Sequence, residues 1–160
     1  MAATHCAKDL CMISHYRELL TALAESAGLD AASLLASEEV IVNDLTISMQ
    51  MAGEGEQSEI LLCSLLGTAT ADRWPEVARS LLLANHLWAG TGGATLGLLD
   101  EDNTVSLSVR QPLTGLDAQK LSAWVSEMAD IGRAWQDFVQ QAHSESSAPA
   151  WPEATAGLHV

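Results

Sequence analysis

The chain has 160 residues, the size of a single domain with a substantial core. Seven Lys and Arg stand against twenty-one Asp and Glu, which gives a formal net charge of −14. Because this charge repels nucleic acid and anionic membrane surfaces, we expect neutral or basic partners.

The apolar runs are shorter than the roughly 18 residues of a membrane-spanning helix. The first residues lack the basic region and apolar stretch of a secretory signal. Three cysteines, an odd number, suit reduced thiols better than a disulfide framework. We therefore expect a cytosolic protein.

Apolar residues at intervals of three and four predict an amphipathic helix over residues 13–27, which Gly28 ends. The pattern then changes to a period of two, and residues 40–42 and 45–51 are predicted to be strands. A polar turn separates them from a third strand at residues 59–66. These strands are expected to form an antiparallel meander.

Helical spacing returns over residues 74–88, where Asp72 is the predicted N-cap. Residues 94–99 and 105–110 predict a hairpin with an acidic tip. Asp117 is the expected cap of a long third helix. The predicted order is therefore α-β-β-β-α-β-β-α, an α+β fold with a twisted antiparallel sheet packed against helices.

The segment after residue 142 has two prolines, small polar residues and no periodicity. These features predict a flexible tail over residues 143–160, with Trp151 as its apolar anchor. Residues 1–142 are expected to form the one folded domain.

A glycine-rich stretch, Gly90-Thr91-Gly92-Gly93, raises the question of phosphate binding. A phosphate loop precedes a helix and supplies a Lys and a hydroxyl after its last glycine. Here the glycines follow a predicted helix and precede a predicted strand. We therefore expect a connecting loop.

Four N-terminal residues, His5, Cys6, Cys11 and His15, are of the types that bind zinc. They lack the Cys-x-x-Cys spacing of a zinc knuckle, so we expect incidental thiols and no metal. For catalysis, Cys63 lies in an apolar strand and His86 lies late in a helix, and no Gly-x-Ser-x-Gly motif is present. We expect no cofactor and no enzymatic activity.

The second predicted helix is apolar nearly all round, because Leu82, Leu83 and Leu87 add to the stripe from Trp74 to Trp88. One sheet covers only one face of a helix, so a second buried surface is expected. A homodimer interface would provide it.

The element order and the segment Leu82-Leu83-Ala84-Asn85-His86-Leu87 resemble the class I type III secretion chaperones, the family of the Tir and Yop effector chaperones. The Leu-Leu-Gly end of the third strand and Arg110-Gln111-Pro112-Leu113 also fit this family. The resemblance covers residues 13–142. The long tail and the start of the first strand depart from the common form and leave the subclass open, a multi-cargo chaperone included.

The resemblance implies a homodimer in the bacterial cytoplasm that binds the N-terminal region of secreted effectors, keeps it competent for secretion and delivers it to the secretion ATPase. We expect a dimer interface at Leu83, Leu87 and Trp88. The expected effector-binding residues lie on the first helix and first strands: Ile13, Tyr16, Leu45, Ile47, Met49 and Met51. Exposed strand edges can accept an added strand, and methionines adapt to different partners. The alternatives are a small adaptor or ligand-binding α+β module, and a small cysteine or histidine enzyme.

Overall fold

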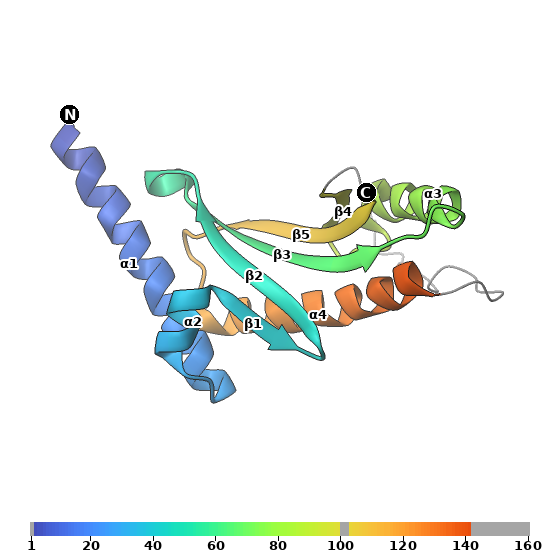
Figure 1. The fold of residues 1–160 in the computed structure, drawn as a ribbon. Helices are drawn as coiled ribbons and strands as arrows, with labels where there is room; N and C mark the ends of the chain where they lie inside the picture. The colour runs from blue at the N-terminus through green and yellow to red at the C-terminus, as the bar shows by residue number, and fades with distance from the viewer. Residues whose placement is uncertain (1, 100–102, 142–160) are drawn as a thin grey trace, which may run out of the picture.

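The computed structural model describes residues 2–99 and 103–141, with side chains from residue 10 onward. It is an α+β fold with one five-stranded antiparallel sheet, in the order β1-β2-β3-β5-β4 (Figure 1). The elements are α1 (Ala2–Ala27), α2 (Ala31–Ser37), β1 (Glu39–Val42), β2 (Leu45–Ala52), η1 (Gly55–Gln57), β3 (Glu59–Thr68), α3 (Trp74–Asn85), η2 (His86–Trp88), β4 (Thr95–Leu98), β5 (Thr104–Pro112) and α4 (Ala118–Gln140). The predicted fold class, meander and hairpin are confirmed. Within the described residues, no helix has the length and apolar character to cross a membrane.

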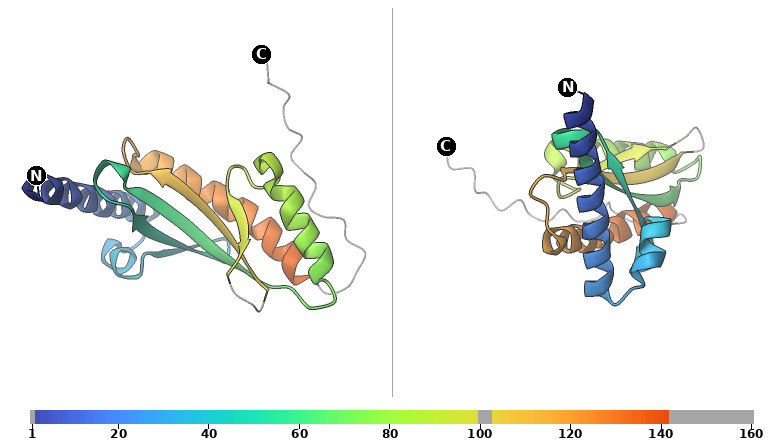
Figure 2. Two further views of the ribbon diagram at one scale, coloured as in Figure 1. Left: turned by 90° about the horizontal axis from the view of Figure 1, so that it is seen from above. Right: turned by 90° about the vertical axis from the view of Figure 1, so that its left-hand side faces the viewer.

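The core lies between the sheet and α4, which runs along one face (Figures 1 and 2). Strand residues alternate between this face and the opposite one, so Ile47, Leu62 and Leu107 are fully buried. Gly132 lets α4 approach closely, because a Cβ there would lie 2.5 Å from Leu45 Cδ2. Seen from above, β2, β3 and β5 lie in front of α4 with no described element over them (Figure 2). The sheet therefore has one covered face and one open face.

The β1–β2 hairpin turns through two residues, Asn43 and Asp44, with φ of 52° and 64°. Two left-handed residues in a two-residue loop are the signature of a type I′ turn, which Asn and Asp tolerate. The turn sets the register in which Val42 pairs with Leu45.

Helix α1 ends at Ala27 before Gly28, as predicted, but it begins at Ala2 instead of residue 13. Helix α2 was not predicted. The Asp30 carboxylate caps it by accepting a hydrogen bond from Ser33 N at 2.7 Å. Both helices lie at the β1 end of the sheet (Figure 1).

At the other end, Arg73 fastens α3 to the C-terminal end of α4. Its guanidinium is buried, donates from Nη1 to the carbonyls of Phe138 (2.9 Å) and Gln141, and lies 5.3 Å from the centre of the Phe138 ring. Arg73 is also the N-cap residue of α3, so the prediction that Asp72 is the N-cap is wrong. Pro75 lies two positions after Arg73. Because proline has no backbone N–H, this position in the first turn of α3 needs no capping partner.

The cap predicted for the last helix is confirmed, since Asp117 Oδ1 accepts from Lys120 N at 2.8 Å. The predicted acidic tip of the hairpin lies largely outside the described residues. Ala142 and the predicted tail at residues 143–160 lie outside them as well.

Candidate functional site

A groove of about 390 Å3 lies where α1, α2 and the end of β2 meet. We call it the α1 groove, and its lining residues are Ile13, Tyr16, Arg17, Leu35, Glu38, Gln50 and Met51. Three of the predicted effector-binding residues, Ile13, Tyr16 and Met51, therefore come together there. The groove combines apolar walls with polar groups, as a binding site for a peptide segment does.

Tyr16 joins the helix side of the α1 groove to the strand side. Its hydroxyl donates to the Met49 carbonyl at 3.0 Å. Burial, and then the nearby Glu38 carboxylate, raises the pKa of Tyr16 well above its ordinary value. The phenol thus stays neutral and keeps donating, which fixes the position of α1 against β2.

The α1 groove also borders a free edge of β2. Strand β1 ends its pairing where Glu39 meets Ser48, and Met49 N donates to the Glu38 carbonyl at 2.7 Å. Beyond this point β2 continues to Ala52, where β3 is its one pairing partner among the described residues. Since backbone groups alternate in direction along a strand, Met51 is the next residue whose N–H and C=O point away from β3. An extended segment in the groove can pair with them.

The other three predicted effector-binding residues lie elsewhere. Leu45, Ile47 and Met49 are buried between the sheet and α4. Their side chains form core contacts in this chain, so the surface of β2 near the groove is provided by Gln50 and Met51.

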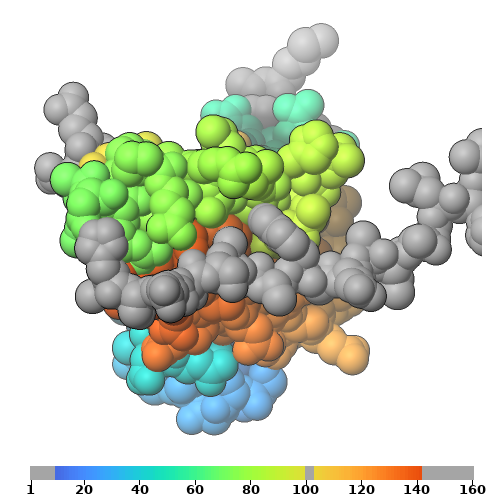
Figure 3. Space-filling model, turned by 90° about the vertical axis from the view of Figure 1, so that its right-hand side faces the viewer, coloured from blue at the N-terminus to red at the C-terminus, as the bar shows by residue number. Residues whose placement is uncertain are grey.

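The predicted interface residues lie at the opposite end of the molecule. Leu83 is on α3, and Leu87 and Trp88 follow in η2 with φ of 52° and 54°. They belong to a group of exposed apolar side chains that we call the α3 patch: Leu82, Leu83, Leu87, Trp88, Leu98 and Leu99. Figure 3 views this end, where α3 stands above the last turns of α4. α3 contacts both η2 and β4, and exposed large apolar side chains on neighbouring elements mark a candidate interaction site.

Asn85 closes the outer edge of β4 beside this patch. Its side-chain amide donates to the Leu96 carbonyl at 2.8 Å and accepts from Leu96 N at 2.9 Å. Both backbone groups of Leu96 are thereby satisfied by a side chain. The β4 edge is blocked at this residue, unlike the edge at Met51.

The glycine-rich loop at residues 90–93 connects η2 to β4, as predicted. Trp135 Nε1 donates to the Gly90 carbonyl at 3.0 Å, and Thr91 is fully buried. Gly92 has φ of 57°, and a Cβ there would come within 2.8 Å of Ile131. The glycines thus let the loop pack directly on α4.

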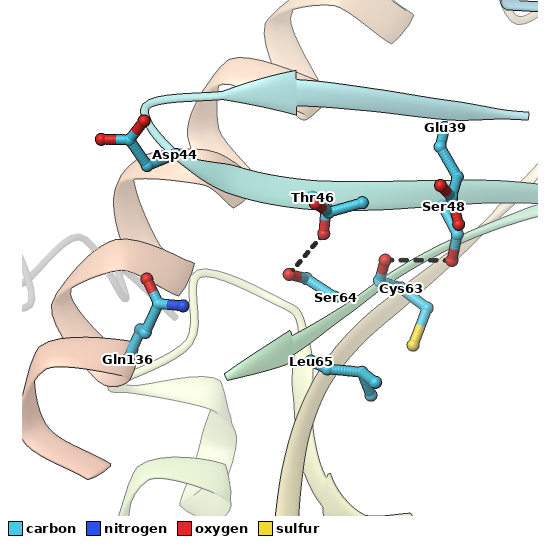
Figure 4. A pocket seen from close by; sticks show the side chains of 8 residues that line it. All are labelled: Glu39, Asp44, Thr46, Ser48, Cys63, Ser64, Leu65 and Gln136. Atoms are coloured by element: carbon cyan, nitrogen blue, oxygen red, sulfur yellow. Dashed lines mark hydrogen bonds between the residues drawn. The ribbon is translucent and has the colours of Figure 1, made fainter. Parts of the chain in front are cut away.

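A second cavity, of about 440 Å3, lies where β2 and β3 diverge beside α4. We call it the β2–β3 cleft, and it is lined by Glu39, Asp44, Thr46, Ser48, Cys63, Ser64, Leu65 and Gln136 (Figure 4). It forms because the pairing of β2 with β3 stops at Ser48 and Cys63. Nothing in the sequence pattern indicated where this pairing ends.

The residues considered for metal binding and for catalysis are dispersed. Among the side chains that the structure describes, no three of His, Cys, Asp and Glu gather as a metal site. Cys11 is exposed, while the side chains of His5 and Cys6 lie outside the described part. Burial raises the pKa of the Cys63 thiol, which disfavours the nucleophilic thiolate, and no histidine lines its cleft.

Four lining residues of the α1 groove were not predicted: Arg17, Leu35, Glu38 and Gln50. Leu35 comes from α2, which was itself missed. The spacing of Asp30 and Ser33 was the available signal for that helix, because Asp is a preferred N-cap.

Comparison with protein families shows that residues 18–136 match the sequence model of the Tir chaperone protein (CesT) family. A comparison with curated proteins found no significant match. Among solved structures, the chain is similar to a chain in the HopA1-SchA chaperone-effector complex, at 19% identity and a TM-score of 0.58, over 81% of this chain and 98% of that one. It is also similar to a chain in the ExsC-ExsE complex, at 16% identity and a TM-score of 0.61, over 79% of this chain and 94% of that one. These two likenesses agree on the fold.

Proposed function

We propose that this chain, which belongs to the Tir chaperone protein (CesT) family, holds the N-terminal region of a type III secretion effector in the α1 groove. Its family is that of the effector chaperones of type III secretion. The effector segment binds in an extended form, which keeps it competent for secretion.

One observation carries the proposal: the α1 groove combines apolar walls with a free strand edge. Ile13, Leu35 and Met51 offer pockets for alternate apolar side chains, while the Met51 backbone can accept an added strand. Main-chain pairing gives affinity for many sequences, and the side-chain pockets select among them. The flexible Met51 side chain favours tolerance of different effectors.

We propose further that the chain is a homodimer through the α3 patch, with Leu83, Leu87 and Trp88 at its centre. These side chains are exposed when the chain is alone, and Leu87 is 78% exposed. A symmetric pairing of two α3 patches would bury them on both copies at once. Because the α1 groove lies at the other end, dimerisation leaves it accessible.

The same proposal covers the remaining properties of the chain. It acts in the bacterial cytoplasm as a binding protein without catalysis, and it delivers its effector to the secretion ATPase. The raised pKa of Cys63 supports a role without nucleophilic chemistry. The net charge of −14 disfavours nucleic acid and anionic membranes as partners.

The test is co-expression with candidate type III effectors that carry or lack their N-terminal region, followed by co-purification. We expect capture only of effectors that carry it. In the Ile13→Glu variant, a charge enters the α1 groove, and the affinity for the effector should fall about tenfold or more.

Leu29→Glu is the matched control. Leu29 is 44% exposed and Ile13 is 41% exposed, but Leu29 lies outside the α1 groove. Equal recovery of full-length and truncated effectors would overturn the chaperone proposal. Equal losses in the two variants would remove the groove as the binding site.

A further inference from the structure

We propose that the β2–β3 cleft binds an extended peptide segment that carries two basic side chains four residues apart. This inference rests on the proposed function, because the cleft would be a second binding site for the N-terminal region of an effector. The cleft lies between the diverging ends of β2 and β3, and Gln136 of α4 lines it on one side (Figure 4).

The charge of the cleft selects a basic ligand. Glu39 and Asp44 are both exposed and line it, whereas no Lys or Arg does. In the described part of the chain, four basic side chains pair with Glu76, Glu59, Asp117 and Asp137, and no ion pair there involves Glu39 or Asp44. The −14 charge of the whole chain adds to the attraction of these two carboxylates for a cation.

The spacing of the two carboxylates fits an extended chain. Glu39 lies opposite Ser48 across the β1–β2 pair, and Asp44 precedes Ser48 by four residues. Asp44 is the turn residue directly before β2, so three strand steps and one turn step separate it from Ser48, about 13 Å in all. In an extended peptide, side chains four residues apart also point the same way and are separated by this distance. Two basic residues at this spacing can therefore reach both carboxylates.

The middle of the cleft suits a small or branched side chain. Leu65 and Cys63 offer apolar surface on β3, and Thr46 and Ser48 offer hydroxyls on β2 (Figure 4). Two hydrogen bonds between β2 and β3 fix the width of the cleft. Ser48 Oγ donates to the Cys63 carbonyl at 3.1 Å, and Ser64 Oγ donates to the Thr46 carbonyl at 2.7 Å. The cleft is thus a formed site bounded by hydrogen-bonded strands.

The test uses a synthetic peptide, acetyl-Arg-Ser-Val-Ser-Arg-amide, and isothermal titration of the full chain at low salt. We expect binding that weakens about two- to fivefold in Glu39→Gln and again in Asp44→Asn, as for partly exposed ion pairs. Asn preserves the left-handed backbone that residue 44 requires. Glu25→Gln, an exposed carboxylate on α1, should leave binding unchanged.

A second peptide, acetyl-Arg-Arg-Val-Ser-Ser-amide, has the same composition and a different spacing. It should bind wild type as weakly as the first peptide binds the Glu39→Gln variant. Equal binding of the two peptides, or binding that ignores both substitutions, would overturn the cleft assignment.

The two proposals fail separately. If effector capture depends on Ile13 while the first peptide shows no dependence on Glu39 or Asp44, the cleft proposal alone is wrong. If no effector is captured, but peptide binding depends on the spacing of the arginines and weakens in both variants, the cleft proposal is supported and the proposed function is wrong.

Discussion

The two ends of the sheet present apolar residues in opposite ways. At the β1 end, Ile13, Leu35 and Met51 surround a recess beside a free strand edge. At the β4 end, Leu83, Leu87 and Trp88 lie exposed on α3 and η2, and the neighbouring strand edge is blocked by Asn85. A recess with a free edge suits an extended segment, whereas an exposed apolar surface suits a folded partner such as a second copy. Apolar content alone would not have distinguished these two roles.

The largest effect that separates the two ends is expected from Leu87→Asp. A carboxylate in the centre of the α3 patch should weaken the proposed dimer by about 2–4 kcal/mol, because it cannot be solvated in a buried interface. Light scattering with size exclusion should show monomers at micromolar concentration.

Ile41→Asp is the control for this experiment. Ile41 is 71% exposed, close to the 78% of Leu87, but it lies on β1 and lines neither the α1 groove nor the β2–β3 cleft. A Leu87→Asp variant that remains dimeric would contradict the interface, while both Asp variants should still capture effector through the α1 groove.

Next in size is the effect of Arg73→Met on the α3 end. Arg73 donates to the carbonyls of Phe138 and Gln141, and its loss removes the donor from one buried and one partly buried acceptor. We expect the free energy of unfolding to fall by about 2–4 kcal/mol in urea titration. Arg79→Met, on the exposed side of the same helix, should change it by about 0.5 kcal/mol or less. Similar losses in both variants would show that Arg73 does not fasten α3 to α4.

Asn85→Ala should remove the block on the β4 edge at a smaller cost, about 1–2 kcal/mol for two hydrogen bonds to Leu96. Amide hydrogen exchange provides the measurement. The Leu96 amide should lose protection, while amides of the β2–β3 pair should keep theirs. Unchanged protection at Leu96 would mean that another group satisfies it.

The smallest effect is expected at the β1 end, from Tyr16→Phe. Loss of the bond to the Met49 carbonyl should lower the free energy of unfolding by about 1 kcal/mol. The raised pKa of Tyr16 adds a pH signature: the folded state favours the neutral phenol, so its stabilisation is complete below the ordinary pKa of 10.0 and declines as pH rises above it.

Tyr16 is the single tyrosine of the chain, so tyrosinate absorbance reports on it directly. Near pH 10.5 the folded protein should show little tyrosinate, and urea should release the full signal. The decline of stability above pH 10 should be weaker in the Phe variant. An ordinary titration of Tyr16 in the folded protein would contradict its buried position.

The sequence predicted β2 and β5 well because apolar and polar residues alternate along them, and a period of two assigns each side chain to one face of the sheet. It missed α2, since seven residues with one buried leucine carry no helical periodicity. The α1 groove was therefore predicted only in part, without Leu35 or Glu38. The alternating apolar residues Leu45, Ile47 and Met49 were assigned to effector binding, but α4 covers that face, and only Met51 lies near the groove. Which residues of a strand stay uncovered depends on where a distant helix ends, and this is a tertiary property.

The amide of Asn85 has a consequence for assembly as well as for the fold. A sheet with two free edges can add strands at both and so grow into a fibril, as a monomer with two reactive groups grows into a polymer. With Leu96 already bonded at the β4 edge, the chain resembles a monomer with one of its reactive groups capped, so strand addition is disfavoured at this end of the sheet. Growth by strand pairing is thereby directed to the opposite end, where the α1 groove lies.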